Sequence, residues 1–170
     1  MVLIRDASMG DLQAVADIAN ARLATTTWEW TDTPHAVHER RQWLEQQHAA
    51  SFPVLVAVED DEVVGWAAYA DFRDSNRWPG YRHTVEHTVH VRETHWGRGV
   101  GLHLIEALSD RARQAGIRVM VAGIDGDNVN SIRFHERLGF LQVARMPEIG
   151  EKLGRRLDLV LMQRSVDCAT

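Results

Sequence analysis

The sequence predicts a mixed α/β domain of the α+β kind, with its elements in the order β α α β β β α β α β β. Three observations carry this prediction. Two β-rich runs are joined by an acidic turn, as in an antiparallel hairpin. A later strand leads through closely spaced glycines into an amphipathic helix. Strands and helices do not alternate as regular βαβ units, which argues against a doubly wound fold. At 170 residues the chain is expected to form one domain, residues 1–170.

The first half of the chain contains four predicted elements after a short strand at residues 2–5. A helix starts after Ser8, because Asp11 follows three residues later as in a capping box. Thr33 is the expected N-cap of a second helix, with Pro34 as its first residue, and this helix runs toward Ala49. Residues 53–59 and 63–70 are the strands of the hairpin. The apolar face of the first helix comprises Leu12, Val15, Ala19 and Leu23.

The most informative segment follows a strand predicted at residues 84–91. Gly97, Gly99 and Gly101 stand at alternate positions before a helix whose apolar stripe begins at Val100 and which ends near Gly116. Alternate glycines let the backbone curl with little Cβ hindrance and leave N–H groups free at the start of the helix. Such a helix start binds phosphate oxygens. The segment therefore predicts a ligand that carries a diphosphate.

The remaining elements are a strand, a helix and two further strands. A strand at residues 119–124 precedes a helix at residues 129–138, which Gly139 ends. Strands are expected at residues 140–144 and 155–162, with residues 146–156 between them. No internal repeat or interdomain linker is present in the sequence.

Two familiar glycine-rich motifs match the glycine turn less well. A Rossmann dinucleotide site has G-x-G-x-x-G in an early βαβ unit and an acidic residue about 20 positions later. Here the spacing is G-x-G-x-G and the turn lies past mid-chain. A Walker loop is excluded, because no Gly-Lys-Ser/Thr follows the glycines. Turn chemistry without any ligand remains the plain alternative.

Composition excludes several classes of protein. The net charge of −5 gives no basic field, which argues against nucleic acid as the main partner. No run approaches the roughly 20 apolar residues of a membrane span, and no secretory leader is recognisable. The single cysteine, Cys168, has no partner for a disulfide, so a cytoplasmic location is expected. No metal is expected, because the histidines lack an HExxH-type spacing.

The element order, the glycine turn and residues 128–140 (N-V-N-S-I-R-F-H-E-R-L-G-F) together resemble the GNAT acetyltransferase superfamily over nearly the whole chain. The resemblance implies the GNAT fold, a mixed and mostly antiparallel central sheet flanked by about four helices. It also implies acetyl-CoA as co-substrate, with the turn around the pyrophosphate. Trp96 departs from the superfamily pattern, which usually has Gln or Arg there. The implied cofactor-binding residues are Val89, His90, Val91, Gly97, Arg98, Gly99, Val100, Gly101, Leu102 and Asn128.

A narrower resemblance rests on Phe72, Arg73, residues 81–91 and His135, which look like the phosphinothricin and methionine sulfoximine (methionine sulfone) N-acetyltransferases. The implied reaction moves an acetyl group to the α-amino group of a small amino acid or analogue by direct attack in a ternary complex. A protonated amine must lose a proton before it attacks a thioester, and Glu86 is the candidate catalytic base. The alternative for Glu86 is a solvated or arginine-paired carboxylate at the end of a sheet.

His135 is the second candidate catalytic residue, at a position where many superfamily members have a tyrosine. That tyrosine protonates the departing CoA thiolate, and a histidine could do the same work. His135 could instead belong to the base machinery or be packed inside its helix. These three roles stay open at the level of the sequence.

Acceptor recognition is expected from the loop before Glu86. Arg73 and Arg82 are the expected anchors of a carboxylate, which a guanidinium group binds in bidentate fashion. The resemblance implies a homodimer, and residues 146–156 are the expected covered surface. A GNAT acting on a peptide N-terminus or a polyamine, and a non-catalytic CoA-binding sensor, are the rival functions. The expected acceptor-binding residues are Arg73, Asp74, Ser75, Tyr81, Arg82, Glu86, His87 and Thr88.

Overall fold

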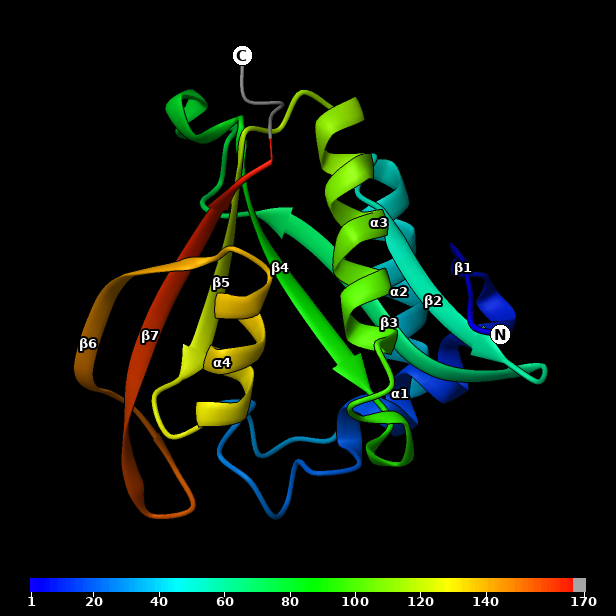
Figure 1. The fold of residues 1–170 in the computed structure, drawn as a ribbon, viewed down its shortest axis with the longest axis horizontal. Helices are drawn as coiled ribbons and strands as arrows, with labels where there is room; N and C mark the ends of the chain where they lie inside the picture. Colours follow the sequence, from blue (N-terminus) through cyan, green and yellow to red (C-terminus); the bar gives the residue numbers. More distant parts are fainter. Residues whose placement is uncertain (167–170) are drawn as a thin grey trace.

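The computed structural model describes residues 1–166 and confirms the predicted order of elements (Figure 1). Cys168 lies outside the described residues. Four α-helices and seven strands make up the described chain: β1 (Leu3–Asp6), α1 (Leu12–Asn20), α2 (Val37–Ala49), β2 (Val54–Glu59), β3 (Glu62–Asp71), β4 (Thr84–Val91), α3 (Val100–Gln114), β5 (Val119–Asp125), α4 (Val129–Arg137), β6 (Leu141–Lys152) and β7 (Arg155–Ser165).

The strands form one sheet in the order β1-β2-β3-β4-β5-β7-β6. Every neighbouring pair is antiparallel except β4 and β5, which run parallel. The predicted fold class, a mixed and mostly antiparallel sheet with four helices, is therefore confirmed. The parallel pair is short, because only Thr84, Val85 and Glu86 of β4 are in register with β5. Beyond these residues the two strands spread apart, as Figure 1 shows, and the sheet opens into a fork.

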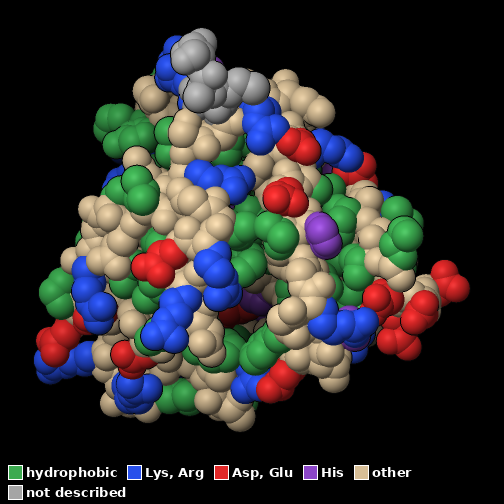
Figure 2. Space-filling view, viewed as in Figure 1, with side chains coloured by type: hydrophobic (Ala, Val, Ile, Leu, Met, Phe, Trp, Pro, Cys, Tyr) green, Lys and Arg blue, Asp and Glu red, His purple; other side chains and the backbone are tan. Residues whose placement is uncertain are grey.

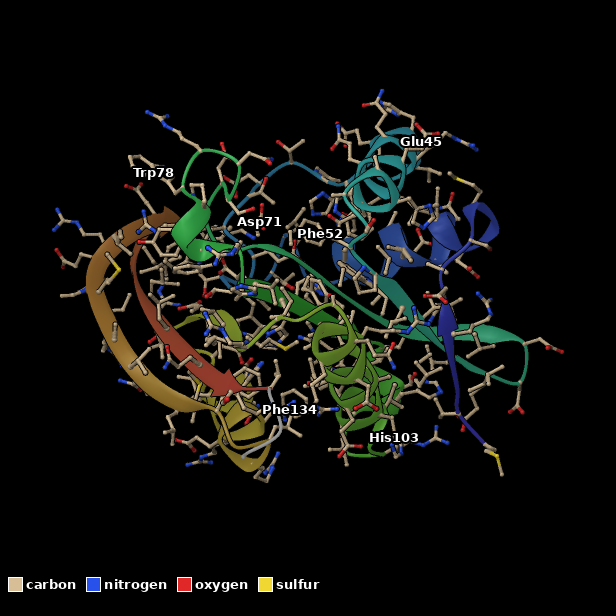
Figure 3. All side chains as sticks on the ribbon, turned by 90° about the horizontal axis from the view of Figure 1, so that it is seen from above. Glu45, Phe52, Asp71, Trp78, His103 and Phe134 are labelled. Atoms are coloured by element: carbon tan, nitrogen blue, oxygen red, sulfur yellow. The ribbon has the colours of Figure 1, made fainter. Side chains whose placement is uncertain are left out.

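The helices cover the sheet from both sides (Figure 3). Helices α3 and α4, with His103 and Phe134, lie on one side, and α2, with Glu45, lies with α1 on the other. The α3 side is filled by a buried cluster that includes Leu104, Ile105 and Leu108. A second buried cluster joins α1 and α2 to the other face of the sheet. Apolar burial on both faces holds the fork in the middle of a packed structure.

The predicted start of the second helix is wrong. The helix begins at Val37, with Ala36 as its N-cap, rather than at Pro34. The side-chain amide of Asn20 pairs with both backbone groups of His35, at 2.8 and 3.0 Å, which holds this part of the chain outside the helix. The Glu39 carboxylate then accepts a hydrogen bond from the Ala36 N–H at 2.9 Å, satisfying one donor at the helix start.

The sixth strand is longer than its sequence pattern predicts. It continues to Lys152, with an irregularity between Met146 and Gly150, and a tight turn at Leu153 and Gly154 leads into β7. Much of the segment expected between the strands is thus part of β6 itself. No helix within residues 1–166 combines the length and apolar composition that a membrane span requires.

Candidate active site

The fork between β4 and β5 provides an unpaired strand edge in the middle of the sheet. One edge of β4 pairs with β3 from Val85 to Val91, whereas the other edge pairs with β5 only as far as Glu86. Val89, His90 and Val91 therefore lie where the described part of β4 has no strand neighbour on its β5 side. Backbone groups at such an edge are available to pair with an extended ligand.

The glycine turn follows this edge and leads into α3. Gly97 and Gly99 have φ angles of +73° and +82°, which favour glycine. No atom lies within 4 Å of the position that a Cβ would take at Gly97. Helix α3 starts at Val100, and its first backbone bond runs from the His103 N–H to the Gly99 carbonyl. The N–H groups of residues 100–102 therefore have no partner within the helix, which makes the turn a site for an anion.

Two glycine-turn neighbours are engaged in contacts of their own. The Arg98 guanidinium lies 2.9 Å from Glu59, so its charge is partly neutralised. The Trp96 indole donates a hydrogen bond to the Val91 carbonyl at 2.7 Å and packs against Trp28. Trp96 thus joins the turn to the end of β4 rather than offering a polar group to a phosphate.

Helix α4 borders the fork on the same side as α3. A Cβ at Gly101 would lie 3.1 Å from the Phe134 ring, so this glycine lets the two helices approach closely. Asn128 is the N-cap of α4, and its side-chain oxygen accepts from the Ser131 N–H at 3.1 Å. The space-filling view shows the molecule hollowed between α3 and α4, with histidine and acidic side chains at the bottom of the hollow (Figure 2).

Glu86 lines a cavity of about 320 Å³ on the α2 side of the sheet. Its carboxylate reaches over Gly123 of β5, where an added Cβ would lie 2.8 Å from Oε1. Glycine at position 123 therefore makes room for the carboxylate. Burial raises the pKa of Glu86 above its ordinary value. The cavity is lined by Trp43, Gln47, Ala68, Tyr69, Ala70, Asp71, Glu86, His87, Thr88 and Gly123.

His87 and His135 form a buried pair at the apex of the fork. Their Nε2 atoms are 3.1 Å apart. Nδ1 of His87 lies 2.9 Å from the Val121 carbonyl, and Nδ1 of His135 lies 2.7 Å from the Ser131 carbonyl. Burial, together with the nearby charges of His135 and Arg164, lowers the pKa of His87 to about 3. Burial also lowers the pKa of His135.

The loop between α1 and α2 crosses the open end of the fork (Figure 1). The Thr27 hydroxyl donates to Asp125 at the end of β5, and Glu29 lies 3.1 Å from Nε2 of His90 on β4. His90 is stacked on a core tryptophan, and burial lowers its pKa to about 4. Within residues 1–166 no group of three or more His, Cys, Asp or Glu side chains is arranged to hold a metal ion. The sequence pattern did not single out Thr27 or Glu29, since only the fold brings them to the ends of β4 and β5.

The loop between β3 and β4 places the remaining expected residues around, rather than in, the Glu86 cavity. The Arg73 guanidinium lies over the rings of Phe72 and Tyr81, at 5.7 and 5.8 Å. Arg82 is exposed and bonded to the Pro79 carbonyl. The expected acceptor-binding residues that lie outside the cavity lining are Arg73, Asp74, Ser75, Tyr81 and Arg82.

Asp71 was not among the residues that the sequence predicted for the site, but its carboxylate lines the cavity together with Glu86. Its carboxylate accepts from the Ser75 hydroxyl at 2.8 Å. In Figure 3, Asp71 lies near the sheet and Trp78 lies at the outer end of the loop. A signal for Asp71 was available, because it ends the long apolar strand β3 with a carboxylate.

Comparison with known proteins places this arrangement in a family. The model of the acetyltransferase (GNAT) family matches residues 15–140. The chain is 42% identical over 165 residues to an L-methionine sulfoximine/L-methionine sulfone acetyltransferase of Pseudomonas paraeruginosa, covering 96% of this chain and 94% of that one. The structure of yncA, a putative acetyltransferase from Salmonella typhimurium with its cofactor acetyl-CoA, is 41% identical with a TM-score of 0.91, covering 98% and 94% of the two chains.

A third similar protein is a GNAT superfamily phosphinothricin acetyltransferase from Sinorhizobium meliloti, whose structure contains acetyl-CoA. It is 30% identical with a TM-score of 0.90, over 96% of this chain and 88% of that one. The family model spans most of the chain, including the fork, the glycine turn and α4. The chain therefore belongs to the GNAT family and is an N-acetyltransferase.

Proposed function

We propose that this protein transfers the acetyl group of acetyl-CoA to the α-amino group of a small amino acid or analogue of the methionine sulfoximine, methionine sulfone or phosphinothricin type. The observation that carries the proposal is Glu86, a largely buried carboxylate in a cavity at the apex of the fork, beside the unpaired edge of β4. The names of the similar proteins support this acceptor class.

The described residues fit acetyl-CoA. The open backbone at Gly97 and Gly99 and the free N–H groups of residues 100–102 suit a diphosphate. At the edge from Val89 to Val91 the Val91 carbonyl is bonded to Trp96, and the remaining backbone donors and acceptors suit the amides of the pantetheine arm. Bound acetyl-CoA supplies the activated acetyl group, while the strand edge orients its thioester and polarises the carbonyl.

Glu86 is the proposed general base. Its raised pKa brings it closer to neutral pH, where a base is most effective. The carboxylate takes one proton from the ammonium group, and the amine nitrogen then forms a bond to the thioester carbonyl carbon. The C–S bond breaks with its electron pair staying on sulfur. The amine nitrogen then gives up its second proton and the CoA thiolate takes up one, so the products are an amide, a thiol and one proton held by Glu86. His135 on α4 is the proposed donor of the proton to sulfur.

We propose that different residues bind the two ends of the acceptor, one set its carboxylate and the other its amino group. Arg73 and Arg82 carry the positive charge near the cavity and suit a carboxylate. Glu86 and Asp71 suit the ammonium group. Asp74, Ser75 and Tyr81 are proposed to complete the site. Because the cavity lining holds two carboxylates and no Arg or Lys, a polyamine is the second candidate acceptor.

We further propose a cytoplasmic homodimer. Strand β6 lies at the edge of the sheet and has exposed apolar side chains, a surface that a second copy would cover. Light scattering at micromolar concentration would show a mass near twice that of one chain. The exposed side chains on β6 and its turn are Leu141, Val143, Met146, Ile149 and Leu153.

The test is CoA release from acetyl-CoA against a panel of amino acids, their sulfone and sulfoximine derivatives, polyamines and short peptides. The derivatives should give the highest kcat/KM. Arg73→Ala should raise the KM of a carboxylate-bearing acceptor about 10-fold or more while leaving the KM of its carboxamide nearly unchanged. Faster acetylation of polyamines would favour the second candidate. CoA binding without turnover of any acceptor would favour a sensor.

A further inference from the structure

The His87–His135 pair occupies the point where the ladder between β4 and β5 stops. Val121 is the last β5 residue in register with β4, opposite Glu86, and Nδ1 of the next β4 residue, His87, lies 2.9 Å from the Val121 carbonyl. The His87 ring is 7% exposed and also contacts Phe140. The His87 ring is therefore packed against β5 at the point where the ladder ends.

Hydrogen-bond chemistry limits where the protons of the pair can lie. Each Nδ1 faces a carbonyl, which only accepts, and one Nε2 must donate to the other, so one Nδ1 of a neutral pair is bare. The Ser131 hydroxyl, 3.4 Å from Nδ1 of His135, can donate to a bare nitrogen there, so the proton is assigned to Nδ1 of His87. Neutral His87 then presents a lone pair at Nε2, and Nε2 of His135 is the atom that can donate to it at 3.1 Å. The charged group near the pair is Arg164, which with burial keeps His87 neutral.

Ser131 allows His135, and not His87, to change its protonation. Nδ1 of His135 faces both the Ser131 carbonyl at 2.7 Å and the Ser131 hydroxyl at 3.4 Å. A protonated Nδ1 donates to the carbonyl, whereas a bare Nδ1 accepts from the hydroxyl. Either way, the contact from His135 to His87 is kept, and the His87 ring stays in one tautomer.

We propose that His87 is a positioning residue for acetyl transfer: it donates from Nδ1 to Val121 and accepts at Nε2 from His135, and so holds β4 apart from β5 where the thioester must bind. The proposal rests on the proposed function, because it assigns the unpaired β4 edge to acetyl-CoA. His87 is assigned to positioning because its contacts run to Val121 of β5 and to His135 of α4, the two elements that border the fork.

Two variants of similar size separate the two nitrogen atoms. In His87→Asn the side-chain amide lies near the former Nδ1 and can still donate to Val121, whereas the longer His87→Gln places its amide near the former Nε2. We expect kcat/KM for acetyl-CoA to fall about 10- to 100-fold in His87→Gln, because the buried side-chain hydrogen bond to Val121 is lost, and by less than about 5-fold in His87→Asn. The acceptor KM should change little in either variant. The exposed His38→Gln serves as the control.

Two further measurements decide the matter together with the kinetics. Calorimetry with CoA alone should show a weaker affinity in His87→Gln than in His87→Asn. This measurement needs no acceptor, so it tests the role of His87 even if no acceptor in the panel is acetylated. Nitrogen NMR of the wild type should find His87 protonated at Nδ1 alone from pH 5 to 8. Equal losses in His87→Asn and His87→Gln, or a His87 ring that titrates in this range, would overturn the proposal. If neither variant folds, the NMR result on the wild type decides.

Discussion

The two sides of the forked sheet use different parts of the chain to build a site. On the α3 and α4 side, ligand-binding capacity lies in the backbone: the unpaired edge of β4 and the N–H groups after Gly99. On the α1 and α2 side it lies in side chains, chiefly Glu86, Asp71 and Gln47. A binding site built from backbone groups tolerates many side-chain substitutions but loses its ligand when a substitution changes the backbone conformation. A site built from side chains loses one functional group with each substitution.

The largest expected effect comes from the side-chain side. Glu86→Gln keeps the shape of the side chain but cannot take a proton, so kcat should fall by about 10²–10⁴. Affinity for CoA should barely change, because the substitution lies across the sheet from the glycine turn. Measuring kcat and CoA affinity on the same preparation checks both claims. A near-wild-type kcat from pH 6 to 9 would return Glu86 to a structural role.

Glu86→Gln should also change stability in a pH-dependent way. Burial raises the pKa of Glu86, so the folded state is penalised at pH values where the carboxylate is ionised. The variant should therefore melt at a higher temperature than the wild type at pH 8, and this difference should shrink as the pH falls toward 4.5. Melting curves at three pH values would show the trend.

The second-largest effect is expected from a substitution in the glycine turn, on the backbone side of the site. Gly99→Asp places a side chain at a φ of +82° and a negative charge at the helix start, so the Kd for CoA should rise about 10-fold or more. Gly116→Asp is the matched control, since Gly116 has a φ of +73° and open space but lies beyond the other end of α3. If calorimetry gives equal CoA affinities for Gly99→Asp and the wild type, the turn does not hold the diphosphate.

The smallest effect concerns two histidines of β4, His87 and His90, one on each side of the sheet. The pKa values of His87 and His90 are lowered to about 3 and about 4, so the unfolded chain binds their protons first as the pH falls. The stability that these neutral rings contribute is complete above about pH 6.5 and is lost between about pH 6.5 and 4. The melting temperature should drop by a few degrees from pH 7 to 5. His87→Asn should reduce the drop and His38→Gln should not; identical profiles in all three proteins would contradict this assignment.

Local sequence predicted the fold and the backbone side better than the side-chain side. Glycine spacing and strand pattern report directly on φ and on periodicity, so the turn at Gly97 to Gly101 and the start of α3 follow from the residues themselves. Glu29, by contrast, meets His90 only after the α1–α2 loop has crossed the fork, a contact between residues 61 positions apart in the chain. The false helix start at Pro34 has the same cause, since a distant amide, Asn20, holds His35 outside the helix. Gly123 lies in an ordinary strand pattern, and the carboxylate it accommodates is on another strand.

Lys152 has a chemical consequence for a protein proposed to hold an activated thioester. It is the only lysine in the sequence, all other strongly basic residues being arginines. Lys152 is only 2% exposed, and its Nζ donates a hydrogen bond to the Glu29 carbonyl at 2.7 Å. Acyl groups pass spontaneously to free, uncharged amines, whereas guanidinium groups remain protonated and unreactive. The protein therefore exposes no lysine amine that would compete with the acceptor for the acetyl group.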